Sequence, residues 1–500
     1  MPLMLFNSFG NKLEEFKPIK NGFVGIYTCG PTVYNSAHIG NFRAYVWEDL
    51  LKRYLLFKGF KVRHVMNLTD VDDKIIKNAI EKGMTIHDFT APFKKAFFED
   101  IKTLNILPAD VYPAATDYIK EMEALIKKLM DRGLAYRGED GCIYFSIKKF
   151  DGYGKLAGIE TKNLKSGARI KQDEYGKEGI GDFALWKAWD ENDGNVFWDS
   201  IFGRGRPGWH IECSAMSSKL LGGTFDIHCG GVDNKFPHHE NEIAQSEGAS
   251  GKKFVNYWLH CEHLIVNGQK MSKSKGNFYT LRDLVNQNLN PSAIRYVLIN
   301  SHYRQPLNFT IDSVKDAEKT LAGLNNLIQR LKLIQTKSIN STNSINSANL
   351  SWSVVRTFEL TENGASGVGV RGEAEVAIDL ALNSFVDAMD NDLNLPKGMG
   401  AIFDFTKKLN KLIDEGVIDE LSASKALDFL KKIDSVLGVM DFGEKRIELT
   451  SEQKRLIKLR EDARAKKDWK KSDEIRDLLK KQGVGLVDNK DGSTDVKSLN

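Results

Sequence analysis

A strand, a loop and a helix that follow one another near the start of the chain most constrain its fold. Residues 23–29 form an apolar run, a loop that contains glycine and proline comes next, and the apolar residues of 41–58 recur at helical spacing. Gly59 ends that helix, and residues 61–69 look like a second strand. Two strands joined by a helix form a parallel, right-handed β-α-β unit. We therefore expect an α/β fold.

The same sheet is expected to resume after an insertion. Apolar runs at 225–228 and 263–266 flank a helical stretch that begins near Pro237, which predicts a Rossmann-type parallel-sheet domain split by the residues between the two halves. From about residue 310, leucine and isoleucine recur at intervals of three and four, so a helical bundle follows. A small C-terminal α/β unit comes last.

These patterns divide the chain into six parts. They are the first half of the sheet domain, 1–120; a connective insertion, 121–205; the second half, 206–269; a lysine-containing loop and the segment after it, 270–320; the bundle with an irregular insertion near 338–372, 321–443; and the C-terminal unit, 444–500. In the last part, residues 445–482 carry fourteen Lys and Arg against eight Asp and Glu. On charge alone, a solvated helix face explains this segment better than an RNA contact. The run Gly-Val-Gly-Leu-Val-Asp after it predicts a short hairpin.

Composition excludes a membrane-spanning chain. With 41% hydrophobic and 28% charged residues, the chain has no apolar stretch near the roughly 20 residues that cross a bilayer. The N-terminus lacks the basic and apolar regions of a secretory signal, so we expect a cytoplasmic protein. Five scattered cysteines, an odd number, argue against a disulfide framework and suit a reducing compartment. A net charge of +4 is too small to indicate a nucleic-acid partner.

Two loops far apart in the sequence together indicate a phosphate site. The first contains His38-Ile-Gly-Asn41 and joins a strand to a helix start, where free N–H groups and the helix dipole attract phosphate. The second is Lys270-Met-Ser-Lys-Ser274, whose two lysines can close over a triphosphate and neutralise the charge that builds on pyrophosphate. Either loop alone is weak evidence, because loop histidines and solvated lysine runs are common. The pair is far more specific.

His238 and Glu242 indicate a metal site. With Pro237 as the first helical residue, these two side chains, four residues apart, project from one helix face about 6 Å apart. Cys29 and Cys213 are the candidates for two further ligands, and two thiolates, an imidazole and a carboxylate make a plausible tetrahedral zinc set. Two buried structural cysteines are the ordinary alternative. Pattern alone also leaves two competing ligands open, His239 and Cys229.

The two loops resemble the nucleotide-binding motifs of class I aminoacyl-tRNA synthetases, and the resemblance covers nearly the whole chain. It implies that seven residues hold ATP, which Mg²⁺ accompanies: His38, Gly40, Asn41, Gly231, Asp233, Lys270 and Lys273. Of these, it implies catalytic roles for His38, Lys270 and Lys273. Asn41 departs from the general motif, which has a second histidine there, but asparagine can still donate a hydrogen bond to a ribose or phosphate oxygen.

Within that class, the chain is similar to the cysteinyl-tRNA synthetases. Their zinc ligands match Cys29, Cys213, His238 and Glu242, and residues of their amino-acid pocket match Gly30, Thr69 and Trp209. Zinc binds a soft thiolate far better than a serine hydroxyl, so direct ligation should select cysteine without an editing domain. The resemblance thus implies that a monomer with one zinc ion joins L-cysteine to tRNA(Cys) at the expense of ATP.

Three other functions fit part of the pattern. A cysteine-activating ligase that acts on a small amine would need only the catalytic part, whereas this chain continues through residues 308–310 into a bundle and a basic segment, 460–469, that matches the anticodon-binding extension of the synthetases. A zinc hydrolase built on His238 and Glu242 would act without ATP. A non-catalytic RNA-binding relative would form no adenylate, and the intact nucleotide motifs argue against it.

Overall fold

The computed structural model describes residues 2–159, 169–170, 181–272, 275–339, 372–443, 450–465, 468–482, 484–488 and 494–498. The chain divides into two compact units, Met1–Met440 and Asp441–Asn500. Lys273 and Ser274 of the lysine loop, and residues 340–371 of the expected irregular insertion, lie outside the described residues. Within the described residues, no helix is both long enough and apolar enough to cross a membrane.

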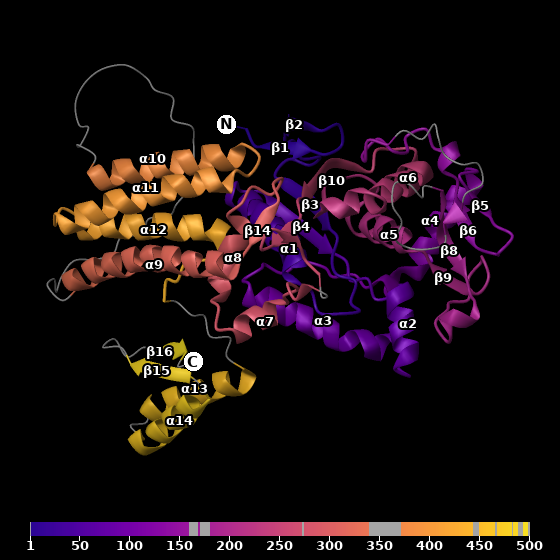
Figure 1. The fold of residues 1–500 in the computed structure, drawn as a ribbon. Coiled ribbons are helices and arrows are strands. Elements are labelled where there is room, and N and C mark those ends of the chain that lie inside the picture. Colours follow the sequence, from indigo (N-terminus) through magenta and orange to yellow (C-terminus); the bar gives the residue numbers. More distant parts are fainter. Residues whose placement is uncertain are drawn as a thin grey trace. The chain divides into compact units, whose positions relative to one another are not determined.

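A four-stranded parallel sheet lies at the centre of the first unit (Figure 1). Its strand order is β11-β10-β3-β4, and every pairing is parallel. The strands are β3 (Phe23–Thr28), β4 (Lys61–Met66), β10 (Phe225–Gly231) and β11 (Val255–Cys261). Nearly all of β3 and β10 is buried, as expected for strands that are covered on both faces. The predicted α/β class with a parallel sheet is confirmed. A hairpin of β1 (Met4–Asn7) and β2 (Lys12–Glu15) precedes the sheet.

The chain leaves the two central strands in opposite directions. From β3 it passes through α1 (Ile39–Phe57) to β4, and from β10 it passes through α6 (His238–Ser250) to β11. Helix α1 contacts β4, β10 and β11, whereas α6 packs on α5 (Trp209–Leu221), which contacts β3 and β4. These helices lie on opposite sides of the strands (Figure 1). Such a reversal opens a crevice at the carboxyl ends of the strands, where ligands bind.

The prediction that residues 263–266 continue the parallel sheet is wrong. They form β12 (Leu264–Val266), which pairs with β13 (Gln269–Lys270) and β14 (Leu307–Phe309) in a separate sheet. The fourth parallel strand is β11, whose sequence Val-Asn-Tyr-Trp-Leu-His-Cys mixes polar and apolar residues. It therefore lacks the continuous apolar run by which a buried strand is recognised. His260 can be buried in this strand because its ring is hydrogen-bonded to His239 and Ser8.

The described residues between β4 and β10 form a second sheet and four α-helices. Besides α5, the helices are α2 (Asp73–Glu81), α3 (Ile86–Thr103) and α4 (Ile119–Asp131). The strands are β5 (Ala135–Arg137), β6 (Ile143–Phe145), β7 (Arg169–Ile170), β8 (Asp182–Ala188) and β9 (Gly205–Pro207), in the order β5-β6-β8-β7 with β9 beside β8. Helix α4 packs on α5 and α6. Ile143 and Phe183 belong to the same buried cluster as Trp258 of β11, so this sheet shares a hydrophobic core with the parallel one.

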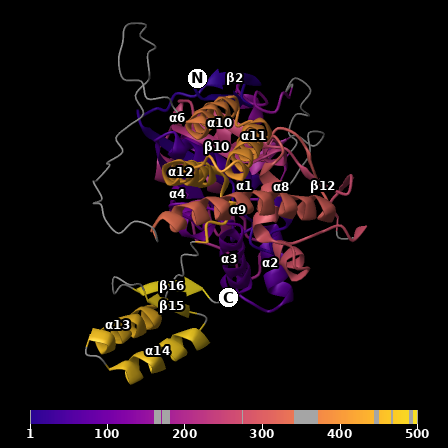
Figure 2. The ribbon, with the colours of Figure 1, turned by 90° about the vertical axis from the view of Figure 1, so that its left-hand side faces the viewer.

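Four long helices follow in the first unit. They are α9 (Ile311–Ile339), α10 (Glu373–Asp390), α11 (Leu395–Asp414) and α12 (Glu420–Leu437), reached through α7 (Leu281–Asn286) and α8 (Pro291–Ile299). Figures 1 and 2 show them side by side, and α10 contacts α11 while α9 contacts α12. Leu321, Leu324, Leu327 and Leu331, whose spacing predicts a bundle, are buried in α9. The predicted helical bundle is confirmed.

The second unit is small. It consists of α13 (Ser451–Ala465), α14 (Trp469–Lys481) and the antiparallel pair β15 (Val484–Asp488) and β16 (Thr494–Ser498), which confirms the predicted hairpin. Its core is formed by four buried residues, Leu456, Ile475, Leu479 and Val484. The basic character of α13 and α14 comes from residues outside this core.

A buried carboxylate joins α1 to the last bundle helix. Asp49 Oδ2 accepts hydrogen bonds from Arg53 Nε at 2.7 Å and from Arg295 Nη2 at 2.5 Å. The same two guanidinium groups donate to carbonyl oxygens at the end of α12, Arg295 Nε to Leu437 at 2.7 Å and Arg53 Nη1 to Ser435 at 3.2 Å. All three charged side chains are buried. Each arginine therefore neutralises Asp49 and also satisfies carbonyls that a helix end leaves without partners.

Replacement of Asp49 by alanine should destabilise the first unit strongly. The variant leaves two guanidinium groups buried without a carboxylate, which costs about 3–5 kcal/mol of the free energy of unfolding. Urea unfolding at neutral pH measures the loss. Asp312→Ala is the matched control, because the Asp312 side chain is 89% exposed and its loss should change the free energy by less than about 0.5 kcal/mol. Equal, small effects of both changes would contradict the role given to Asp49.

Glu48 of α1 is buried without a hydrogen-bond partner for either carboxyl oxygen among the described residues. Burial raises the pKa of this carboxyl from 4.5 to about 8. The carboxyl is therefore protonated in the folded chain over a pH range in which the unfolded chain has it ionised. Between these two values the folded state binds more protons than the unfolded state, so the free energy of unfolding falls as the pH rises.

Glu48→Gln should remove this pH dependence. Relative to the unchanged chain, the variant should become more stable as the pH rises from about 5 to about 8, by on the order of a few kcal/mol. Urea unfolding of both chains at several pH values across this range measures the difference. A difference in the free energy of unfolding that stays constant with pH would show that Glu48 is not held protonated.

Candidate active site

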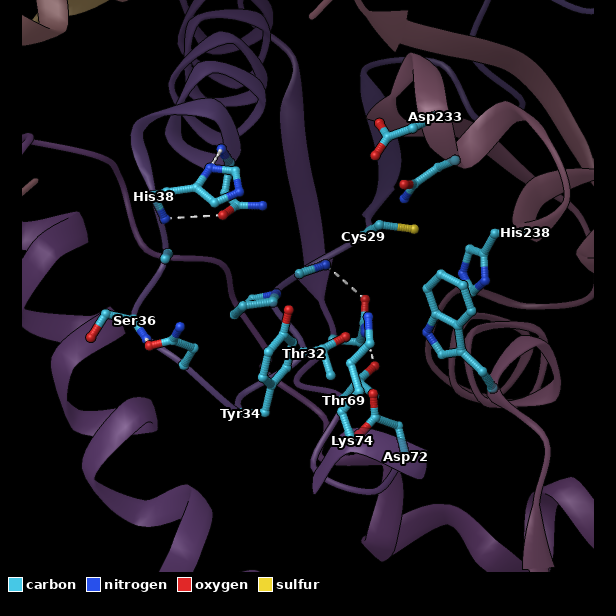
Figure 3. A pocket seen from close by; sticks show the side chains of 18 of the residues that line it. Cys29, Thr32, Tyr34, Ser36, His38, Thr69, Asp72, Lys74, Asp233 and His238 are labelled. Carbon is cyan, nitrogen blue, oxygen red and sulfur yellow. Dashed lines mark hydrogen bonds between the residues drawn. The ribbon is translucent and has the colours of Figure 1, made fainter. Parts of the chain in front are cut away.

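A cavity of about 640 Å³ opens at the carboxyl ends of β3, β4 and β10 (Figure 3). Its walls come from the loop between β3 and α1, from the segment that joins β4 to α2, from the turn after β10, and from the first residues of α5 and α6. In Figure 3, His38 lies at one side of the cavity and His238 at the other, with Cys29 between them. Segments that are far apart in the sequence thus meet at one edge of the sheet.

The loop with His38 forms the N-terminus of α1. His38 is the N-cap residue: its Nδ1 accepts the N–H of Asn41 at 3.2 Å, and Asn41 Oδ1 accepts the N–H of His38 at 3.0 Å. This reciprocal cap satisfies two donors of the first turn, so the helix begins at Ile39 and not at about Asn41 as predicted. The asparagine that departs from the general motif therefore has a structural role here.

The His38 loop contacts Met271 in the lysine loop and Phe278 just after that loop. The His38 ring contacts the Phe278 ring edge to face, with 5.2 Å between centroids. A Cβ atom at Gly40 would lie 3.2 Å from Met271 Cε and 2.9 Å from the His38 ring. Glycine at this position therefore lets the lysine loop approach closely. The two motifs, more than 200 residues apart, are adjacent in the structure.

The other residues expected to hold ATP occupy several positions. Lys270 ends β13 and is exposed, and Lys273 lies outside the described residues. Gly231 ends β10, and Asp233 lines the cavity from the following turn, η6 (Val232–Lys235). A Cβ atom at Gly231 would lie only 2.3 Å from Asp233 Oδ1, so glycine allows the carboxylate to lie over the strand end.

Four buried side chains with metal-binding atoms meet beside the cavity. Ligand atoms of Cys29, Cys213, His238 and Glu242 all lie within 4.8 Å of one another. Cys29 follows β3, Cys213 is in α5, and the other two are in α6. Helix α6 begins at His238, so Pro237 is the residue before the helix and not its first residue as predicted. The spacing of four still places His238 and Glu242 together, with Nε2 and Oε1 3.2 Å apart.

A second set of four overlaps the first. It comprises Cys29, His228, His239 and Glu242, which again lie within 4.8 Å of one another. Cys29 Sγ is 3.2 Å from His239 Nε2, and Glu242 Oε2 is 3.1 Å from His228 Nε2. His239, which the sequence left open as a competing ligand, is thus close enough to be one.

Burial makes the charged forms of the first set costly. It raises the pKa of the Cys29 thiol, raises the pKa of the Cys213 thiol well above its usual value, and lowers the pKa of His238 to about 3. The negative charge of Glu242 adds to the shift of both thiols. A divalent cation reverses this penalty, because it stabilises thiolates and binds a neutral imidazole. Glu242 Oε1 accepts no hydrogen bond in the described part of the chain, which suits an oxygen that binds a metal.

The residues expected to form the amino-acid pocket line the cavity next to this cluster. The N–H of Gly30 donates to Asn67 Oδ1 at 2.9 Å, and a Cβ atom on Gly30 would lie 1.8 Å from the Asn67 carbonyl oxygen. Thr69 Oγ1 donates to Glu212 Oε2 at 3.2 Å. The Trp209 ring lies against the His238 ring with 4.5 Å between centroids. Only glycine fits at position 30, because the Asn67 carbonyl oxygen occupies the space that a side chain would need.

Sequence reasoning missed one wall of the cavity and a network of histidines behind it. The wall contains Tyr34, Asp72 and Lys74. Its signal was present: the polar run Thr69-Asp-Val-Asp-Asp-Lys74 follows a strand at the sheet edge where ligands bind. The histidine network joins His210 to His238 at 3.0 Å and His239 to His260 at 2.8 Å. These contacts link separate elements, so no spacing in the sequence reveals them.

Comparisons with known proteins agree on a family. The model for the tRNA synthetases class I (C) catalytic domain matches residues 15–319, and the model for the DALR domain matches residues 384–441. The cysteine–tRNA ligase of Brachyspira hyodysenteriae is 49% identical over 98% of this chain and 98% of its own length. The cysteine–tRNA ligase of Protochlamydia amoebophila is 46% identical over 99% of this chain and 97% of its own.

Solved structures share the fold at low identity. Methionyl-tRNA synthetase of Mycobacterium tuberculosis in complex with methionyl-adenylate has a TM-score of 0.59 and 14% identity, and covers 83% of this chain and 89% of its own. A putative arginyl-tRNA synthetase from Campylobacter jejuni has a TM-score of 0.54, also at 14% identity, with 85% and 94% covered. The catalytic-domain match and the near full-length relatives confirm the resemblance seen in the sequence. The chain belongs to the cysteine–tRNA ligases, a family of class I tRNA synthetases.

Proposed function

We propose that the chain forms cysteinyl-adenylate from L-cysteine and ATP and transfers the cysteinyl group to the 3′-terminal adenosine of tRNA(Cys). In the first step, a carboxylate oxygen of cysteine attacks the α-phosphorus, and pyrophosphate leaves with the electron pair of the P–O bond that breaks. In the second, a ribose hydroxyl attacks the carbonyl carbon and AMP leaves. A phosphate oxygen of AMP takes the hydroxyl proton. Mg²⁺ accompanies the ATP.

One observation carries this proposal: a single cavity is lined both by the capped loop of α1 and by two members of the cysteine, histidine and glutamate cluster. His38, which is hydrogen-bonded to Asn41, lies at one side of the cavity, and His238 lies at the other, with Cys29 between them. An ATP phosphate at the N-terminus of α1 and a thiol at the cluster would therefore face each other across the cavity. This supports a reaction between an amino acid with a thiol and a nucleotide.

In this proposal the side chains act by position and charge. The first turn of α1 receives phosphate, and Lys270 and Lys273 neutralise the charge that builds on pyrophosphate. Asp233, whose carboxylate lies close to Gly231, accepts hydrogen bonds from the ribose in this proposal. Because the attacking carboxylate is already ionised, no side chain is needed as a general base. Three residues enclose the amino acid, Gly30, Thr69 and Trp209.

Cys29, Cys213, His238 and Glu242 are the zinc ligands in this proposal. When bound, zinc supplies a soft cation that holds a thiolate far better than a hydroxyl. The first set is favoured over the second because it offers two thiolates instead of one. His228 then donates to Glu242 Oε2 and orients the carboxylate, which leaves Oε1 for the metal. The thiol selectivity of the enzyme follows from this set.

Cysteine should support ATP–pyrophosphate exchange, and serine should not. Exchange needs only the adenylation step, so it tests the first half of the reaction without tRNA. Removal of zinc with a chelator should abolish exchange with cysteine, and added zinc should restore it, because the metal holds the thiol. Exchange that is equal for the two amino acids would refute metal-based selection. Folded, zinc-loaded protein that shows no exchange at all would refute the proposed function.

Aminoacylation separates the proposed function from a ligase that acts on a small amine. The unchanged chain should attach radiolabelled cysteine to tRNA(Cys) in a product that is sensitive to mild base, as an ester is. A chain that carried out exchange but transferred cysteine only to amines would support the alternative.

Cys213→Ser should lower the zinc content from about one ion per chain to well below that value, since a hydroxyl replaces a thiolate ligand. Metal analysis after dialysis measures the loss, and the variant should lose cysteine-dependent exchange in parallel. Cys142→Ser is the matched control, because Cys142 is also buried but lies directly before β6, where its sulfur accepts the N–H of Ala188. A Cys213 variant that keeps full zinc, with zinc lost instead from a His239→Gln variant, would favour the second set.

A further inference from the structure

One wall of the cavity is used neither by ATP nor by cysteine in the function proposed above. It consists of Tyr34 and Asn35 of the loop after β3 and of Asp72 and Lys74 at the start of α2. Figure 3 shows Tyr34, Asp72 and Lys74 together along one side of the cavity, away from both His38 and His238. Tyr34 and Lys74 are exposed, whereas Cys29 and His238 are buried. Solvent therefore reaches the cavity at this wall.

The chemistry of this wall suits a nucleotide. The Lys74 ammonium lies 5.4 Å from the centroid of the Tyr34 ring, so a cation and an aromatic face stand next to each other at the rim. Proteins that hold single-stranded nucleic acid combine cations, which contact the phosphates, with aromatic rings, on which bases stack. Two of the three substrates are small enough to be enclosed. The third is the end of a macromolecule and has to enter where solvent reaches the cavity, as it does at this wall.

The start of α2 is fixed in place by buried cations of the second sheet. Asp73 Oδ1 is 2.9 Å from Lys187 Nζ and 2.6 Å from Arg206 Nη2, and these two side chains are 2% and 8% exposed. Both cations hold the pKa of Asp73 at about 2, although burial opposes this shift. The carboxylate beside Lys74 is thus already neutralised, and Asp72 Oδ1 accepts the N–H of Ile75 at 2.6 Å as the helix cap. Lys74 therefore lies at a helix end that is held in place by the ion pairs of Asp73 and by the Asp72 cap.

We propose that this wall receives the 3′-terminal nucleotide of the tRNA, with Lys74 contacting its phosphate and Tyr34 contacting its base. The inference rests on the proposed function and adds the subsite of the third substrate. It assigns Lys74 and Tyr34 to the transfer step and not to adenylation. Neither residue then matters until tRNA is present.

The test separates the two steps in Lys74→Met and in Tyr34→Ala. Cysteine-dependent ATP–pyrophosphate exchange should stay within about twofold of the unchanged chain, whereas the single-turnover rate of transfer from the preformed adenylate to tRNA should fall about tenfold or more. For Lys74→Met, the dependence of tRNA binding on salt should also weaken by about one phosphate contact. Tyr34→Phe keeps the ring and should transfer at nearly the unchanged rate.

Lys77→Met is the matched control, because Lys77 lies on the same helix with its side chain 76% exposed and does not line the cavity. It should leave both steps unchanged. Thermal unfolding of every variant excludes loss of fold as the cause. If Lys74→Met lowers exchange as much as transfer, Lys74 serves adenylation and the inference is wrong; if it lowers neither, the wall does not bind tRNA. Absence of exchange in the unchanged chain would instead overturn the proposed function itself.

Discussion

The parallel pairing of β3 with β10 is the interaction on which the rest of the site depends. These strands are about 200 residues apart, and their register places Thr28 opposite Cys229. The N–H of Cys29 continues the pairing by donating to the Cys229 carbonyl at 3.2 Å. From this edge the chain turns in opposite directions, into the phosphate loop on one side and into the turn of Asp233 and α6 on the other. A shift in this register would separate the nucleotide loop from the metal cluster.

Buried polar side chains of α6 lie behind the cavity and contact the strands of the same sheet. Helix α6 is almost wholly buried although most of its residues are polar, which is costly unless each polar group has a partner. Two of these residues, Glu242 and His239, have partners on β10 and β11. His228 of β10 contacts Glu242, and His260 of β11 contacts His239 and Ser8. The Trp258 ring stacks on the His228 ring, with 4.6 Å between centroids, and so covers this histidine with an apolar surface. The cluster is therefore held by the sheet and the helix together.

The sequence predicts those features that repeat locally. The apolar period of α9 identifies the bundle, and the run from Phe23 to Thr28 identifies the first buried strand. The pairing of the His38 loop with the lysine loop is predicted by chemistry, because a triphosphate needs both. Features that depend on contacts between distant segments are not predicted. His260 of β11 is buried because it is hydrogen-bonded to residues of other elements, and Asp73 forms ion pairs with buried cations more than 100 positions away.

Helix α1 connects the cavity to the bundle through its own length. It has 19 residues and is therefore about 28 Å long. Its first turn is capped by His38 and Asn41 at the cavity. Its third and fourth turns carry Asp49 and Arg53, and Arg53 donates to a carbonyl oxygen near the end of α12. The phosphate loop and the junction with α12 are therefore parts of one continuous helix. Charges buried at such a junction cost more than apolar packing would, but their hydrogen bonds define one arrangement of α1 against α12.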